Sequence, residues 1–256
     1  MTSTHVETAV VGTAVTGTTL VITINRPHAR NAIDRAVAEQ ISAAVDRLER
    51  ESDLAVGILT GAGSTFCSGM DLKAFATQGF PFIGERGLAG ITRVQRTKPL
   101  IAAVEGYAVA GGCELALACD LIVASGTAVF GLPEVTRGLV ASEGGAIRLP
   151  KRLPYHVAMH MLLTGDTLDA AAAARLGLVS QLAAPGEALT DAIDLAARIA
   201  HNAPLAVAAT LRIAALNDSD AFTVQDRIAA PVAASQDARE GAQAFAEKRP
   251  PRWQGH

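Results

Sequence analysis

The chain has 256 residues, of which 50% are hydrophobic and 18% are charged, and its formal net charge is -3. This length and composition predict one large folded domain, with or without an appended segment, and exclude a mainly disordered chain. Lysines are few and the arginines are scattered, so the sequence has no basic stripe and we expect no nucleic-acid partner.

No apolar run is long enough to span a membrane, and residues 1–15 lack a basic leader with an unbroken apolar core. We therefore expect a soluble, cytoplasmic protein with no membrane partner. Cys67, Cys113 and Cys119 form no CxxC pair, so they indicate neither a disulfide framework nor a zinc site. His156 and His160 are spaced as on one helix face, but we interpret them as surface residues and expect no metal.

The first part of the chain predicts a hairpin followed by a helix and a buried strand. Residues 6–11 and 18–24 read as two strands, and Arg26-Pro27 ends the second. Asp34 is a candidate N-cap for a helix that closes near Ser52, and its apolar stripe consists of Val37, Ile41, Val45 and Leu48. The apolar run at 54–60 predicts a buried strand that leads into a Gly-rich turn at 61–72.

A second Gly-rich turn lies where a strand passes into a helix. After a Gly-rich stretch at 77–84, we predict a helix over 85–96 and a buried strand over 100–104. Gly111 and Gly112 then precede small, helix-forming residues. Backbone N–H groups at a helix start have no intrahelical partner, and glycine allows close approach, so this turn is a candidate oxyanion site.

Two glutamates accompany these turns. Glu114 follows the glycines directly, and Glu134 follows Pro133 at the end of another short apolar segment. Either carboxylate alone is typical of a solvated helix end or loop. Because each lies among small and apolar residues, where a charge gains little unless it is used or paired, we interpret the two as candidate catalytic groups.

From Gly144 onward the pattern is mostly helical. We predict helices over 155–163, 169–176, 187–201, 204–216 and 222–248, with a last strand at 178–182. The final third has more apolar positions than one helix face needs, which indicates either a subunit interface or additional core. These positions are Ile193, Leu195, Ile199, Leu205, Val207, Leu211 and Ile213.

Five segments, in order along nearly the whole chain, resemble the crotonase (enoyl-CoA hydratase/isomerase) superfamily. They are Arg26-Pro27 with Asn31-Ala32, residues 66–72 (FCSGMDL), residues 103–115 (AVEGYAVAGGCEL), residues 130–134 (FGLPE) and residues 247–251 (EKRPP). The resemblance implies an α/β fold, a spiral of repeated ββα units. It places the core, with its CoA-binding and catalytic site, in residues 1–200. Residues 201–256 would then form a C-terminal α-helical region that builds a homotrimer or a dimer of trimers.

The resemblance also implies the roles of individual residues. The backbone N–H groups of Met70 and Gly111 match an oxyanion hole for the thioester carbonyl of an acyl-CoA. Glu114 would activate a water, and Glu134 would supply the proton to Cα. The residues implied in CoA binding are Arg26, Ala32, Ser68, Met70, Asp71, Leu72 and Lys248. No separate cofactor is expected, because coenzyme A is part of the substrate.

The acyl pocket departs from the pattern of mitochondrial-type hydratases. Leu132 stands where they carry Gln, and the Leu-Pro-Glu form is similar to that of carnitinyl-CoA dehydratases. Ser142 and Glu143 are also placed in this pocket. Glu143 either favours a polar or cationic acyl tail or is a charge at a helix N-terminus, and the sequence favours the helix charge.

These residues predict an enoyl-CoA hydratase, which adds water reversibly and syn across the 2,3 double bond of a 2-enoyl-CoA, as in fatty-acid β-oxidation. Two sister activities stay open: a carnitinyl-CoA dehydratase-like enzyme and a Δ3,Δ2-enoyl-CoA isomerase. A non-catalytic acyl-CoA-binding protein is the alternative from another class, and the presence of both glutamates argues against it.

Overall fold

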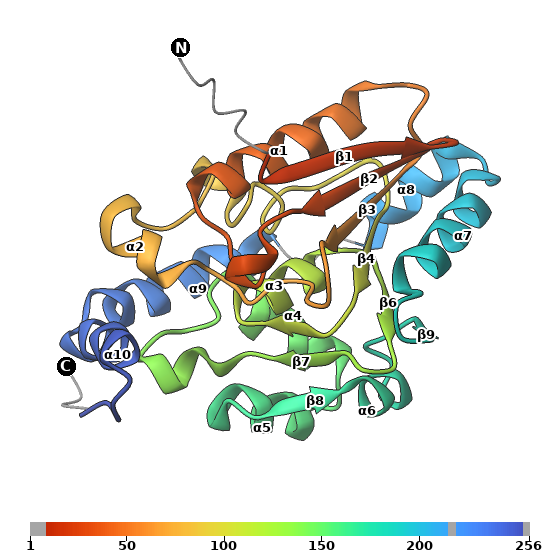
Figure 1. Cartoon of the computed structure of the whole chain (residues 1–256). Coiled ribbons are helices and arrows are strands. Elements are labelled where there is room, and N and C mark those ends of the chain that lie inside the picture. The colour runs from red at the N-terminus through yellow and green to blue at the C-terminus, as the bar shows by residue number, and fades with distance from the viewer. Residues whose placement is uncertain (1–8, 215–218, 253–256) are drawn as a thin grey trace, which may run out of the picture.

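The computed structural model describes residues 9–214 and 219–252. Within them, a six-stranded sheet has the order β1-β2-β3-β4-β6-β9, in which β1 is antiparallel to β2 and the other neighbours are parallel (Figure 1). Its strands are β1 (Val11–Thr16), β2 (Thr19–Ile24), β3 (Val56–Gly61), β4 (Leu100–Val104), β6 (Leu121–Ser125) and β9 (Gln181–Ala183). A smaller sheet joins β5 (Tyr107–Val109), β7 (Val129–Gly131) and β8 (Thr167–Asp169).

Both faces of the large sheet are buried, as the continuous apolar runs predict for parallel strands. Successive side chains point to opposite faces, so Leu20 and Ile22 join the main core, whereas Val21 joins a second core cluster. Helix α1 (Arg35–Arg50) packs into the main core, and α7 (Ala188–Ala200) covers the second cluster.

The prediction for α1 is confirmed. Asp34 is its N-cap, and the carboxylate accepts a hydrogen bond from the Val37 N–H at 2.9 Å. The predicted stripe of Val37, Ile41, Val45 and Leu48 is buried. A 3.6-residue period and a capping side chain are local signals, which is why the sequence alone locates this helix.

The first strand begins later in the chain than the predicted span of residues 6–11. The outer strand of the hairpin is Val11–Thr16, whereas residues 6–8 of the predicted strand lie outside the described residues. The hairpin turns at Gly17, whose φ of +59° is a left-handed conformation that favours glycine.

The predicted helix over 85–96 is wrong. Helix α2 (Leu72–Gln78) comes earlier, and a single 3₁₀ turn (Gly84–Arg86) is followed by irregular backbone up to the start of β4. Gly84, Gly87 and Gly90 all have positive φ. Each glycine within a helix costs about 1 kcal/mol, and Gly87 and Gly90 lie inside the predicted span, so this segment favours a loop.

The remaining helices follow the predictions with one exception. They are α3 (Gly111–Ala118), α4 (Gly145–Arg152), α5 (Tyr155–Thr164), α6 (Ala170–Arg175), α8 (Pro204–Ala214), α9 (Ser219–Ala234) and α10 (Gln236–Glu247), and short 3₁₀ turns lie at Pro27–Ala29 and Pro133–Arg137. The single helix predicted over 222–248 is two helices, because Ser235 breaks the run and caps α10 through the Ala238 N–H at 3.0 Å.

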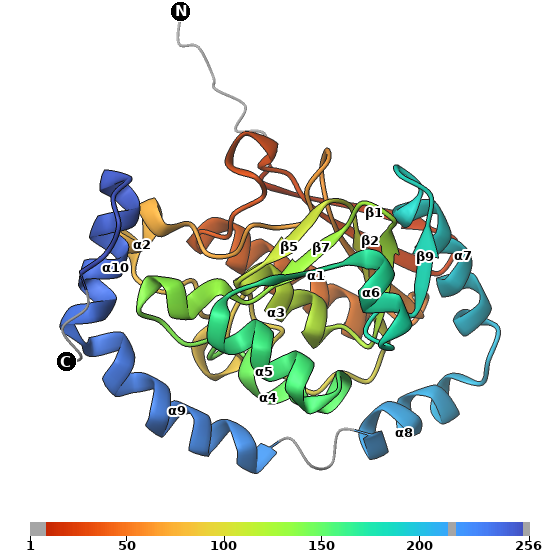
Figure 2. The ribbon, with the colours of Figure 1, turned by 90° about the horizontal axis from the view of Figure 1, so that it is seen from below.

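The C-terminal helices lie at the periphery, as Figure 2 shows for α8 and α9. Helix α9 contacts α4, and α10 contacts the Pro133–Arg137 turn. The division of the chain at residue 200 stays a prediction. No helix in the described ranges is long and apolar enough to cross a bilayer.

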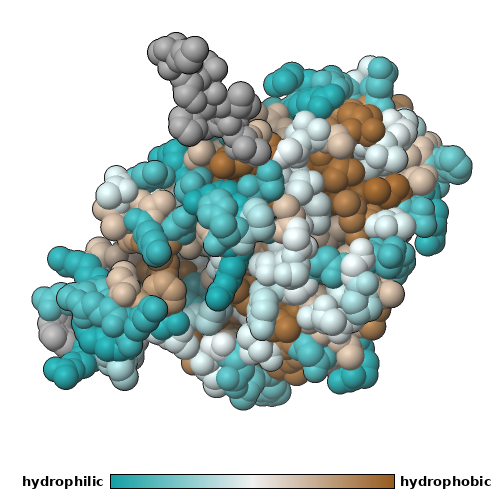
Figure 3. All heavy atoms as spheres, in the orientation of Figure 1, coloured by the Kyte–Doolittle hydropathy of each residue, from teal (hydrophilic) through white to brown (hydrophobic). Residues whose placement is uncertain are grey.

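The surplus apolar residues of the last third fall into two groups. On α7, Ile193, Leu195 and Ile199 pack partly against the second core cluster. On α8, Leu205 is 85% exposed and Ile213 is 68% exposed. Figure 3 shows apolar surface near β1 to β3 and α7 as well. The first group is therefore additional core, whereas the second is free to meet another surface.

Gly112 offers a test of how closely α3 packs. A Cβ at this position would overlap the carbonyl oxygen of Cys67, which is backbone and cannot move aside cheaply. We expect Gly112→Ala to lower the free energy of unfolding by about 1–3 kcal/mol. Gly126→Ala is the control, since its Cβ would have only Ala183 O nearby, at 3.8 Å. Equal urea midpoints for the two variants would contradict this packing.

Candidate active site

Two turns meet at the carboxyl ends of β3 and β5. The turn after β3 pairs with β5 through hydrogen bonds from Cys67 N–H to Tyr107 O (3.0 Å) and from Val109 N–H to Cys67 O (3.1 Å). This pairing brings the predicted oxyanion residues together. A Cβ built on Gly111 would lie 3.5 Å from the backbone nitrogen of Met70.

The backbone N–H groups of Met70 and Gly111 are both available to a ligand. Within the described ranges, neither donates a hydrogen bond, although Ile33 pairs with the residues on both sides of Met70. Gly111 is the first residue of α3, where the helix dipole favours a negative charge. Two unpaired donors side by side at such a point can stabilise an oxyanion.

The backbone is strained where it forms this pair of donors. Gly69 has φ of +93°, and Ala110, the N-cap of α3, has φ of +50° although it carries a side chain. A Cβ on Gly69 would lie 2.9 Å from the Cβ of Ala110. Glycine at this position therefore allows both the positive φ and the close approach of the two turns. Strain of this kind collects at functional sites.

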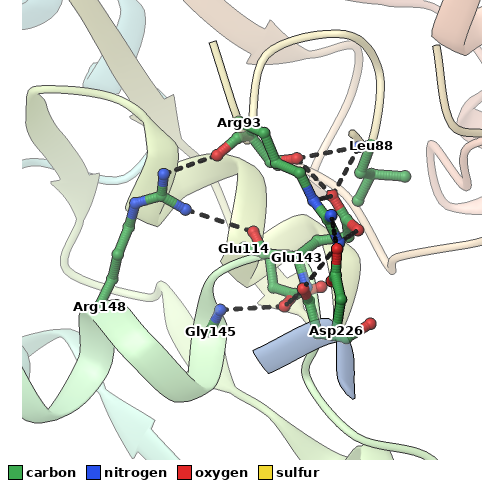
Figure 4. Close-up of polar contacts among 9 residues, drawn as sticks. Leu88, Arg93, Glu114, Glu143, Gly145, Arg148 and Asp226 are labelled. Atoms are coloured by element: carbon green, nitrogen blue, oxygen red, sulfur yellow. Dashed lines mark hydrogen bonds and ion pairs between the residues drawn. The ribbon is translucent and has the colours of Figure 1, made fainter. Parts of the chain in front are cut away.

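Glu114 lies in the first turn of α3 and is 4% exposed. Its Oε1 accepts hydrogen bonds from the backbone N–H groups of Glu143 at 2.7 Å and Gly145 at 3.0 Å (Figure 4). Burial, and then the charge of Glu134, raise the pKa of Glu114 well above its usual value, while the two N–H groups oppose the rise.

Glu134 follows Pro133 in the 3₁₀ turn and is 9% exposed. Its Oε2 is buried and accepts no hydrogen bond from any residue that the structure describes. Burial raises the pKa of Glu134 to about 7. A buried carboxyl oxygen without a partner is costly, which is typical of a group held for a ligand or a reaction.

The two glutamates thus form one buried, coupled pair. Both pKa values are raised, and ionising one group makes it harder to ionise the other. Burial and mutual repulsion therefore favour a pair that keeps one proton over a pair that carries two charges. A charged carboxylate beside a protonated carboxyl group is the combination that general acid–base chemistry requires.

The residues predicted to bind CoA are arranged around one ion-pair cluster. The guanidinium of Arg26 contacts Asp71 at 3.0 Å, Asp34 at 3.3 Å and the carbonyl of Ala32 at 2.7 Å. Partial burial opposes the effect, but hydrogen bonds from Ala74 N–H and Arg26 lower the pKa of Asp71. Arg26 therefore holds the start of α2 in place.

Three of the other predicted CoA contacts, Ser68, Met70 and Leu72, are half-buried along the same turn. Lys248 is exposed at the end of α10, and no hydrogen bond or ion pair within the described residues joins it to this turn. Their role in binding CoA stays a prediction.

The predicted acyl-pocket residues lie beside Glu114, and the carboxylate of Glu143 is paired with Arg93. Leu132 is 1% exposed, and a Cβ on Gly145 would lie 2.9 Å from its Cδ1 and 3.0 Å from Glu114 Oε1. Ser142, next in the chain to Glu143, is half-buried. Glu143 directly precedes Gly144, the N-cap of α4, and its carboxylate forms an ion pair with Arg93 at 2.6 Å. It is therefore not a free charge for a cationic tail, and its interpretation as a charge at the helix N-terminus stays a prediction.

Sequence reasoning missed the segment that contacts Glu143. Leu88, Thr92 and Arg93 lie in the region wrongly predicted as a helix. The glycines of this region were a usable signal for a loop, but no sequence pattern links it to a carboxylate 50 residues away. Among the described residues, no cluster of three or more His, Cys, Asp or Glu side chains has the arrangement of a metal site.

Comparisons with known proteins place this geometry in a family. Residues 15–256 match the model of the enoyl-CoA hydratase/isomerase family. Enoyl-CoA hydratase EchA19 of Mycobacterium tuberculosis is 43% identical over 93% of this chain and 94% of its own length. The chain belongs to this family.

Solved structures agree. An enoyl-CoA hydratase from Mycobacterium tuberculosis H37Rv is 53% identical with a TM-score of 0.80, and a carnitinyl-CoA hydratase from Mycobacterium avium is 39% identical with a TM-score of 0.93. Each alignment covers 97% of this chain and 100% of the other. The predicted crotonase-like α/β fold with a helical C-terminal region is confirmed.

The raised pKa of Glu134 predicts a pH-dependent stability. The folded pKa of about 7 lies above the ordinary 4.5, so the folded state retains a proton that the unfolded state loses. This contribution to stability is complete below pH 4.5 and is lost as pH rises through 7. At pH 8 we expect the free energy of unfolding of Glu134→Gln, measured with urea, to exceed that of the wild type by up to about 3 kcal/mol. The advantage should disappear near pH 4, and a gap independent of pH would contradict the raised pKa.

Proposed function

We propose that the protein is an enoyl-CoA hydratase that adds water to the 2,3 double bond of a 2-enoyl-CoA. One observation carries the proposal: two buried carboxyl groups, one with an unpartnered oxygen, accompany two backbone N–H groups that donate to no described residue. Membership of the family supports the same activity.

The two N–H groups would act on the thioester carbonyl. Adding oxygen at Cβ shifts negative charge onto this carbonyl oxygen, and donors fixed before the reaction stabilise that charge without reorganising. Losing one donor of this kind costs about 3 kcal/mol of transition-state stabilisation. Because Met70 and Gly111 would act through the backbone, the side chain at residue 70 shapes the pocket rather than the oxyanion hole.

The glutamate pair would handle the water and the protons. Glu114 would be the base that takes a proton from water as oxygen adds to Cβ, and the two backbone N–H groups that it accepts favour the charged form that this role needs. A charge on Glu134 opposes that form, so Glu114 would act as the base while Glu134 is protonated. Glu134 would give its proton to Cα. The overall step consumes one water and leaves the pair with the same single proton. No cofactor is needed, since coenzyme A belongs to the substrate.

A carnitinyl-CoA dehydratase-like activity is the second candidate, favoured by Leu132 and by the fold of the Mycobacterium avium carnitinyl-CoA hydratase. A free carboxylate in the pocket would attract a cationic acyl tail, but Arg93 already pairs with Glu143. This contact favours an uncharged acyl group.

A panel of CoA thioesters read by mass spectrometry tests these activities together. Hydration adds the mass of one water to a 2-enoyl-CoA, dehydration of carnitinyl-CoA removes one, and isomerisation changes no mass. We expect the gain with uncharged 2-enoyl-CoAs. Binding without turnover of any thioester would favour a non-catalytic acyl-CoA-binding protein instead.

Amide variants of the two glutamates test the mechanism. Glu114→Gln and Glu134→Gln keep the side-chain size but remove the base or the acid, so each should lower kcat about 100- to 10,000-fold. The double variant should be little worse than either single variant, because the pair acts as a unit. Multiplicative losses would show that the groups do not share one water. Nearly full 3-enoyl to 2-enoyl isomerisation in Glu114→Gln would instead indicate an isomerase, which needs one base.

We further propose a cytoplasmic homotrimer or dimer of trimers that acts in fatty-acid β-oxidation. The exposed apolar side chains of α8 support the assembly, since Leu205 and Ile213 lie eight residues apart on one helix face.

Charge on α8 tests the assembly. Leu205→Asp combined with Ile213→Asp should shift the sedimenting species toward the monomer, because burying two carboxylates in an apolar interface is unfavourable. Ala214→Asp, which adds a charge to an exposed position on the opposite side of the helix from Leu205, is the control. An unchanged sedimentation coefficient for the double variant would exclude α8 from the interface.

A further inference from the structure

Glu143 connects the two halves of the active site. Its backbone N–H donates to Glu114 Oε1 at 2.7 Å, while its own carboxylate, 3% exposed, accepts a hydrogen bond from the Leu88 N–H at 2.8 Å. The side chain of Leu88 reaches the oxyanion turn, since a Cβ on Gly111 would lie 2.9 Å from Leu88 Cδ2. Glu143 therefore contacts both Glu114, the proposed base, and Leu88, which packs on the oxyanion donor Gly111.

Arg93 compensates the buried charge of Glu143. Its guanidinium makes two contacts with the carboxylate, NH2 to Oε1 at 2.6 Å and Nε to Oε2 at 3.3 Å. Thr92 Oγ1 donates to the same Oε2 at 2.6 Å. Charge-assisted, two-point hydrogen bonds of this kind are short and directional, so they fix the Glu143 side chain and with it the backbone amide.

Helix α9 supports this ion pair from outside (Figure 4). Asp226 contacts Arg93 NH1 at 2.6 Å. The ring of Phe222 lies below two guanidinium groups, Arg93 at 5.5 Å and Arg148 at 5.2 Å, and Arg148 donates to the carbonyl of Thr92 at 2.6 Å. Helix α9 therefore contacts Arg93, and Arg93 pairs with Glu143, whose backbone amide donates to Glu114.

We propose that Glu143 is a positioning residue for the hydration reaction, with Arg93 as its counter-ion. The ion pair fixes the Glu143 side chain and so holds its backbone amide on the Glu114 carboxylate. The proposal rests on the proposed function in that Glu114 is the base. It assigns the Glu143 carboxylate to positioning rather than to contact with the acyl group.

Kinetics of Glu143→Gln test the proposal, because glutamine keeps the shape and the backbone amide but removes the ion pair. We expect kcat for hydration to fall about 10- to 100-fold, the usual result of a misplaced catalytic group, with KM within about twofold. Glu49→Gln is the control. Glu49 fixes the other end of the same segment through the Thr97 and Lys98 N–H groups, and it should leave kcat unchanged. A kcat for Glu143→Gln within twofold of the wild type would overturn the proposal.

A double-variant cycle separates positioning from general damage. If Glu143 acts through Glu114, then adding Glu143→Gln to a Glu114→Gln enzyme should cause little further loss of kcat. The full 10- to 100-fold loss in that background would show that Glu143 acts by another route.

Hydrogen exchange tests the positioning without any turnover. In Arg93→Gln, the amides of Leu88, Glu143 and Gly145 should exchange at least about tenfold faster than in the wild type, while Glu49→Gln should leave them unchanged. Unchanged protection in Arg93→Gln would overturn the proposal even in an active enzyme. A wild type that hydrates no thioester would instead refute the proposed function, and the exchange measurement would still decide the positioning.

Discussion

The site depends on two carboxyl groups buried in one apolar region. Water solvates neither, so two charges together are strongly unfavourable and the pair retains a proton at a pH where free glutamates have none. The surrounding structure maintains this condition. Helix α3 and the turn after Pro133 bring Glu114 and Glu134 into the core, and the hydrogen bonds they receive are unequal: Glu114 accepts two backbone N–H groups, whereas one oxygen of Glu134 accepts none. The proposed mechanism assigns the two glutamates different roles on the basis of this inequality.

The sheet supplies the other half of the chemistry. The turns after β3 and β5 lie at the same end of the molecule, and pairing through Cys67 sets their nitrogens side by side. Close packing fixes the result, since a side chain at Gly112 would collide with backbone. The positive φ of Ala110 is part of the same arrangement. A rigid, strained turn of this kind presents donors that do not move as charge develops on a ligand.

The sequence predicts those features of the fold that depend on signals a few residues apart. The cap at Asp34, the stripe of α1 and the buried strands follow from periods and side-chain chemistry within a few residues. The proximity of Glu114 and Glu134 depends on tertiary structure, so local sequence signals do not predict it. It is expected only because the sequence resembles a known family. The helix predicted over 85–96 is wrong because Gly87 and Gly90 lie inside it, both with positive φ. The contact between Arg93 and Glu143 was not predicted, because it joins an irregular segment to a loop 50 residues away. Asp226, the second partner of Arg93, lies on α9, still farther along the chain.

The shared proton of Glu114 and Glu134 is the central claim, and carbon NMR of the enzyme labelled with ¹³C at glutamate Cδ tests it most directly. Comparing spectra of the wild type with those of Glu134→Gln identifies the signals of the pair. We expect one carboxyl group of the pair to be still protonated at pH 6 and the two signals to titrate together, with Glu114 becoming easier to ionise once residue 134 is an amide. Two independent titrations near the ordinary pKa of 4.5, unaffected by the substitution, would contradict this expectation.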